Sequence, residues 1–136
     1  MDGVILVDKP IGWTSFDVVA KIRGNLRRIT GNKKIKVGHA GTLDPMATGL
    51  LIVLAGNMTK QQDSFMKKDK VYEAEVTLGA VSDTDDAEGV LVSTGYDVRS
   101  MKTGKEEIAD ALNSFVGELE QMPPQYSAIK LNGQKA

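Results

Sequence analysis

Residues 38–55 read GHAGTLDPMATGLLIVLA, a glycine-rich loop followed by a continuous apolar run. The run Leu50–Ala55 contains only apolar residues and is far too short to span a membrane, so it predicts a strand buried on both faces. The preceding Gly38–Gly49 holds three glycines and a proline, which predicts a loop. Its one carboxylate, Asp44, precedes Pro45. An aspartate in this setting most often caps a turn, and it can also act as a nucleophile or base.

The segments before this loop have strand and helix signals. Gly3–Val7 reads GVILV and predicts a short buried strand. Thr14 and Asp17 are spaced as a capping box that opens an amphipathic helix. From Arg27 to Val37 we expect an exposed loop or hairpin that turns at Gly31-Asn32.

The segments after the loop continue the alternation of strands and helices. The stretch from Thr59 to Lys67 suits a short helix, and Val71–Leu78 alternates as a strand with Tyr72 on its apolar face. Tyr72 reads either as a core tyrosine or as a platform on which a nucleobase stacks. Ser82–Gly89 predicts an acidic turn, which lacks the glycine and the ligand spacing of an EF-hand loop.

Three weaker elements complete the prediction. Val90–Val92 suits a short strand, and Thr103 with Glu106 suits a second capping box that opens a helix ending near Gly117. From Tyr126 to Leu131 we expect a further strand. The alternation predicts an α/β or α+β class.

Composition excludes several classes of site. The 136 residues contain no cysteine and one histidine, which rules out disulfides, thiol nucleophiles and cysteine metal sites. The N-terminus lacks the features of a signal peptide, so we expect a soluble, cytoplasmic protein.

Charge is unevenly distributed along the chain. The net charge is −1, yet residues 18–43 contain no acidic residue and seven of the 17 basic ones, which leaves ten basic and all 18 acidic residues elsewhere. Such asymmetry indicates either a polyanion partner for one face or simply a solvated basic face. The basic residues are Lys21, Arg23, Arg27, Arg28, Lys33, Lys34 and Lys36.

Five stretches together resemble one enzyme family. GHAGTLDPMATGLL is similar to the signature of the TruB-type pseudouridine synthases, the bacterial tRNA pseudouridine-55 synthases. VDKPIGWTS, DKVYEAEVTLG, SDTDDAEG and MPPQYSAIKLNGQKA resemble further motifs of that family in the same order. The resemblance implies an α/β (α+β) fold on a largely antiparallel mixed sheet with flanking helices. It also implies isomerisation of uridine to pseudouridine at position 55, in the T loop of tRNA, without a cofactor or metal.

The resemblance also implies roles for particular residues. Asp44 matches the catalytic nucleophile, whether it attacks the ribose or the base, and Tyr72 matches the tyrosine that stacks on the flipped base and takes part in proton transfer. The expected substrate-binding positions are His39, Asp86, Lys9, Gly41 and Thr42, with Lys9 and Pro10 mainly supporting the catalytic loop. The seven basic residues listed above become candidate contacts to the RNA backbone.

Members of that family are longer than this chain. We therefore expect residues 1–136 to be the N-terminal part of the catalytic domain, without its remainder and without the C-terminal RNA-binding domain. The expected partner is the T stem-loop of tRNA, with no membrane, no protein partner and a monomeric state. The alternatives are a non-catalytic RNA-binding or RNA-folding module, and a pseudouridine synthase that acts on another RNA.

Overall fold

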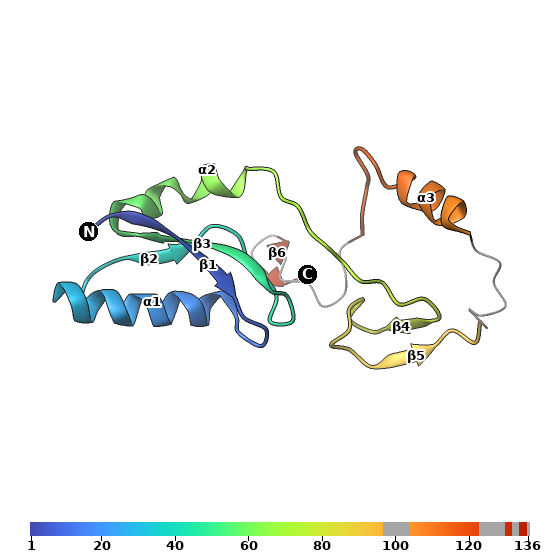
Figure 1. Ribbon diagram of the computed structural model, residues 1–136, viewed down its shortest axis with the longest axis horizontal. Helices are drawn as coiled ribbons and strands as arrows, with labels where there is room; N and C mark the ends of the chain where they lie inside the picture. The colour runs from blue at the N-terminus through green and yellow to red at the C-terminus, as the bar shows by residue number, and fades with distance from the viewer. Residues whose placement is uncertain (97–103, 123–129, 132–133, 136) are drawn as a thin grey trace. The chain divides into compact units, whose positions relative to one another are not determined.

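The computed structural model describes residues 1–96, 104–122, 130–131 and 134–135. It divides the chain into two compact units, Met1–Tyr72 and Glu73–Ala136 (Figure 1). Helices accompany small sheets in which every strand pair is antiparallel, so the predicted α/β (α+β) class with largely antiparallel pairing is confirmed.

A three-stranded sheet forms the centre of the first unit. Its order is β1 (Gly3–Lys9), β3 (Gly49–Ala55) and β2 (Val37–His39), so β3 lies in the middle. Because β3 is paired on both edges, its apolar run is the most buried segment of the unit, with Leu51 and Val53 almost fully enclosed. Burial of each such side chain contributes roughly 1.5–3 kcal/mol. The strand predicted over Leu50–Ala55 is confirmed, but its burial on both faces only in part, because Leu50 is exposed and Ile52 is half-buried.

Helices flank this sheet in the first unit. Helix α1 (Ser15–Thr30) runs along one side of the strands, and the 3-10 helix η1 (Gly56–Gln61) with α2 (Gln62–Met66) runs along the other (Figure 1). The face away from α1 nevertheless remains exposed at Leu6 and Leu50. Val18 and Val19 of α1 form one buried cluster with Leu51 and Val53 of β3. The predicted helix over residues 59–67 is thus confirmed in part, as a 3-10 turn followed by a short α-helix.

The first turn of α1 carries the predicted capping box. The Thr14 hydroxyl accepts a hydrogen bond from the Asp17 amide at 3.0 Å, and the Asp17 carboxylate accepts from the Thr14 hydroxyl at 2.6 Å and from its amide at 2.9 Å. These hydrogen bonds lower the pKa of Asp17 below its usual value. A carboxyl with a lowered pKa stabilises the fold at neutral pH, and this contribution is lost as the pH falls through that lowered pKa.

The predicted loop from Arg27 is wrong in its first four residues. Helix α1 continues to Thr30 and ends at Gly31, whose φ of 69° is left-handed and whose amide donates to the Arg27 carbonyl. Two features of the sequence favour this longer helix. Arg27 and Arg28 place positive charge at the negative end of the helix dipole, and glycine is the usual residue just past a helix end.

Two predicted strands differ from the structure. The strand over Gly3–Val7 forms and extends to Lys9, but it is buried on one face only, with Leu6 66% exposed on the other. The strand over Val71–Leu78 is not formed. Alternating side chains favour a strand only when a neighbouring backbone supplies the ladder, and no described residue pairs with this segment.

The second unit contains a small hairpin, a helix and a short ladder. Strands β4 (Ala80–Ser82) and β5 (Leu91–Ser93) flank the predicted acidic turn, so the strand expected at Val90–Val92 is displaced by one residue. Helix α3 (Lys105–Asn113) follows. Strands β6 (Lys130–Leu131) and β7 (Gln134–Lys135) pair with each other, while Tyr126 lies outside the described residues.

The cap of α3 is a further correction. The Gly104 amide donates to the Glu107 carboxylate at 3.0 Å, one residue later than the Thr103–Glu106 pair that we predicted. Thr103 lies outside the described residues. The helix also ends at Asn113, before Gly117. A capping box is recognised in a sequence by a hydroxyl residue followed three positions later by a carboxylate. The observed cap, Gly104, has no side-chain acceptor, so this pattern favoured Thr103 instead.

Candidate active site

The loop between β2 and β3 is held at both ends by the sheet. At its start the Ala40 amide donates to the Ile52 carbonyl at 2.9 Å, and a hydrogen bond of 2.7 Å joins His39 Nδ1 to the Gly41 carbonyl. Gly41 and Gly49 both have a φ of 115°, a conformation that side chains rarely adopt. The two glycines let the chain leave β2 and enter β3 sharply, so the connection between the two strands is short.

Asp44 occupies the first position of a turn within this loop. Its carbonyl accepts a hydrogen bond from the Ala47 amide at 3.0 Å, with Pro45 at the second position, where proline favours such turns. The backbone of Asp44 therefore makes the turn. The side chain is exposed, and no described residue donates a hydrogen bond to its carboxylate.

The residue after Asp44, Pro45, is held from the β1–α1 connection. The Pro45 carbonyl accepts from the Gly12 amide at 2.8 Å and from Lys9 Nζ at 3.3 Å. Lys9 is fully buried, and its ammonium also donates to the carbonyls of Trp13 at 2.7 Å and Pro10 at 3.2 Å. Three acceptors match the three donors of an ammonium, which a buried charge requires. Its burial favours support of the loop over contact with substrate.

The peptide before Asp44 is fixed from α1. Ser15 is buried, and its hydroxyl donates to the Leu43 carbonyl at 3.1 Å and accepts from the Leu43 amide at 2.9 Å. Sequence reasoning assigned Ser15 no role. The pattern held no sign of this contact, because its partners lie 28 residues apart.

The other expected site residues are not all brought together. His39, the last residue of β2, and Gly41 are half-buried, while Thr42 is exposed on the same loop as Asp44. Tyr72 is the last residue of the first unit and is 69% exposed, and the described residues provide no hydrogen bond to its hydroxyl. Asp86 belongs to the second unit. The expected roles of these residues remain predictions.

Asp86 organises the acidic turn of the second unit. Its carboxylate accepts from the Thr84 hydroxyl at 2.6 Å and from the Glu88 amide at 2.9 Å. These hydrogen bonds hold the pKa of Asp86 below its usual value, the Thr84 contact contributing most. Within the described part of the chain, no three His, Cys, Asp or Glu side chains gather in a way that could hold a metal ion.

Six of the seven basic residues between Lys21 and Lys36 are exposed. Arg23 is the exception, half-buried with its guanidinium 5.4 Å from the centre of the Phe16 ring, a cation–π contact. Exposed members are available to phosphates, and they are Lys21, Arg27, Arg28, Lys33, Lys34 and Lys36.

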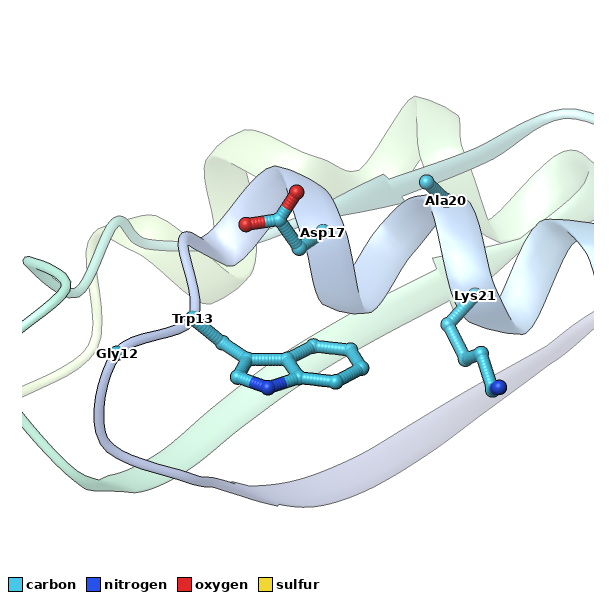
Figure 2. A pocket seen from close by; sticks show the side chains of 5 residues that line it. All are labelled: Gly12, Trp13, Asp17, Ala20 and Lys21. Atoms are coloured by element: carbon cyan, nitrogen blue, oxygen red, sulfur yellow. The ribbon is translucent and has the colours of Figure 1, made fainter.

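An open groove of about 380 Å³ lies beside the first half of α1. Figure 2 shows the Trp13 indole extending along the helix toward Lys21, with Gly12, Asp17 and Ala20 completing the lining. Its lining does not include Asp44. The groove shares the β1–α1 connection with the Asp44 loop and is otherwise a separate surface feature.

Comparison with known proteins identifies the class to which this fold and loop belong. The model of the TruB family pseudouridylate synthases, N-terminal domain, matches residues 27–136. The chain belongs to this family.

Among the described residues, none of the helices combines the length and apolar character that a membrane crossing requires.

Curated relatives share this similarity over nearly the whole chain. Proteins named tRNA pseudouridine synthase B from Clostridium kluyveri, Endomicrobium trichonymphae and Clostridium novyi are 46%, 47% and 48% identical to it over 135 residues, 99% of its length. The matched region is 43%, 55% and 43% of those relatives, so the chain spans about half their length or less.

Proposed function

We propose that this chain is the N-terminal part of the catalytic domain of an enzyme that converts uridine 55 in the T loop of tRNA to pseudouridine. The observation that carries the proposal is Asp44, an exposed carboxylate whose neighbouring peptides are fixed on both sides. A nucleophile held in this way is poised to attack without reorganising its loop. Membership of the family and the names of the relatives support the substrate class.

The reaction exchanges one bond between base and ribose for another. The bond from N1 of uracil to C1′ of ribose breaks, the base turns, and C5 of uracil bonds to C1′. The proton on C5 is lost and N1 gains one, so the product is an isomer of the substrate and no oxidant or reductant is needed. Asp44 forms the transient covalent adduct. An adduct on C1′ of the ribose is broken as C5 of uracil displaces the carboxylate, and an adduct on the base is broken by elimination of the carboxylate after the new bond has formed.

Removal of the base from its stack costs a few kcal/mol, because the T loop is folded. Stacking on an aromatic face recovers roughly 1–3 kcal/mol. Tyr72 is the aromatic residue that we assign to this task, with a further role in transferring the C5 proton. His39, Gly41 and Thr42 border the extruded nucleotide, and Asp86 joins the polar network around the tyrosine. Lys9 supports the loop. The enzyme acts as a monomer in the cytoplasm, where tRNA is processed.

The experiment uses the full-length protein that contains this chain and an unmodified tRNA transcript. Carbodiimide labelling followed by primer extension should show a new stop at position 55, and a transcript with cytidine at that position should show none. Modification at a different position would assign the enzyme to another RNA site. Binding without any modification would instead support a non-catalytic RNA-binding or RNA-folding module.

The exposed basic residues between Lys21 and Lys36 should bind RNA through its phosphate groups. Replacing Arg27 and Arg28 together by glutamine keeps helix-forming residues and removes two exposed charges. Affinity for tRNA and for an unrelated RNA should fall by a similar factor, and the slope of log affinity against log salt should shrink by about one to two units.

A matched control for charge is the exposed pair Lys67 and Lys68, replaced by glutamine in the same way. The control should leave the salt slope nearly unchanged. An unchanged slope in the arginine variant, or an equal change in both variants, would make the last turn of α1 a solvated helix end without a role in RNA binding.

A further inference from the structure

One buried hydroxyl connects the start of α1 to the loop of the candidate nucleophile. Ser15 is the first residue of α1 and is 3% exposed. Its Oγ both donates to the Leu43 carbonyl and accepts from the Leu43 amide, at 3.1 and 2.9 Å. A single hydroxyl thus satisfies both backbone polar groups of one residue, as a neighbouring strand would.

The residue that Ser15 holds is the one directly before Asp44. The Leu43 side chain also packs against the buried cluster that Val18, Val19, Leu51 and Val53 form between α1 and β3. Both the backbone and the side chain of Leu43 are therefore fixed. On the other side of Asp44, the Pro45 carbonyl is held by Gly12 and Lys9. The contact with Ser15 completes the restraint on the nucleophile from its N-terminal side.

The residue beside Ser15 offers a natural comparison. Thr14 also carries a hydroxyl at the start of α1, but it is exposed and bonds only to Asp17 within the helix. Loss of the Thr14 hydroxyl removes a hydrogen bond of the helix cap and leaves the Asp44 loop untouched. Only the loss of the Ser15 hydroxyl releases the peptide before Asp44.

We propose that Ser15 is a positioning residue that sets the direction from which Asp44 approaches the substrate, through its paired hydrogen bonds to Leu43. This inference rests on the proposed function, because it requires Asp44 to be the attacking group. A reacting atom displaced by about 1 Å can slow a reaction on the order of a hundredfold. A looser loop should therefore slow the chemical step and leave RNA binding, which uses other groups, almost intact.

The test compares Ser15→Ala with Thr14→Ala in the full-length protein. Three quantities are measured for each variant well below its melting temperature: the single-turnover rate at saturating tRNA, the Kd for tRNA, and the melting temperature itself. We expect Ser15→Ala to lower the rate by about tenfold to a hundredfold. Its Kd should stay within about twofold of the unmodified protein, since no phosphate contact is lost. Thr14→Ala should keep the original rate, with a lower melting temperature.

A second variant, Ser15→Cys, covers the case in which the alanine variant does not fold. It keeps the shape of the side chain with a weaker donor and acceptor, so its rate should fall between those of serine and alanine. An original rate in Ser15→Cys, or equal rates in Ser15→Ala and Thr14→Ala, would overturn the inference. An unmodified protein that forms no pseudouridine would instead overturn the proposed function.

Discussion

Asp44→Asn is expected to abolish pseudouridine formation in the full-length protein while binding of tRNA survives. Asparagine has nearly the same shape and keeps the turn, because the turn uses the backbone carbonyl of residue 44. It lacks the anionic oxygen that a covalent adduct requires. The single-turnover rate should fall by more than about a thousandfold, as when other nucleophiles are removed. Quantitative carbodiimide labelling gives the rate, and filter binding gives the Kd.

The control for Asp44→Asn is Asp63→Asn, which removes another exposed carboxylate, on α2, from the same unit. This variant should retain the original rate. Turnover near the original rate in Asp44→Asn would remove Asp44 from the role of nucleophile, and the proposed mechanism would fail with it.

Tyr72→Phe is expected to lower catalysis by orders of magnitude with almost no change in melting temperature. The phenyl ring keeps the stacking face, so affinity for RNA should stay near its original value, and only proton transfer is lost. Tyr72→Ala should lose both affinity and rate, with about 1–3 kcal/mol of stacking removed.

The interpretation of Tyr72 as a core residue makes the opposite prediction. Loss of a buried, satisfied hydroxyl costs about 1 kcal/mol and would lower the melting temperature at normal activity. The structure places Tyr72 69% exposed, which agrees poorly with a core position. Thermal melts and single-turnover assays distinguish the two cases, with Tyr96→Phe as a matched control at another exposed tyrosine. A Tyr72→Phe variant with a lower melting temperature and the original single-turnover rate would support the interpretation of Tyr72 as a core residue.

Local patterns predicted much of the first unit. The capping box at Thr14 and the apolar strand after Gly49 depend on residues close in sequence, and both are observed. The loop predicted over Gly38–Gly49 is confirmed in part, because Gly38 and His39 belong to β2 and Gly49 opens β3. The strand expected over Val71–Leu78 failed because strand formation depends on a partner that the segment's own pattern does not specify. The end of α1 was misplaced because the charges of its last turn were read as a loop rather than as a favourable helix end.

In the candidate site too, features that depend on neighbouring residues could be predicted, and contacts between residues far apart in the sequence could not. Asp44 could be predicted as the candidate nucleophile from the loop and from the resemblance of its motif. The resemblance also predicted Lys9 as a support of the loop. The residue pattern predicted neither its contact with Pro45, 36 residues away, nor the contact of Ser15 with Leu43, 28 residues away. The spacing of apolar and polar residues within one segment does not indicate which distant residue it contacts. Only the antiparallel register of β1 with β3, which pairs Lys9 with Gly49, places the β1–α1 connection beside the loop.

The extended segment Val71–Leu78 has a consequence for handling this chain by itself. Val71 is 99% exposed and Val76 is 77% exposed. The described residues supply no backbone hydrogen-bond partner along the segment. An unpaired stretch with alternating apolar side chains is a template onto which a second molecule can add a strand. A solution of residues 1–136 should therefore self-associate as its concentration rises, and light scattering should detect oligomers that a charge introduced at Val76 suppresses.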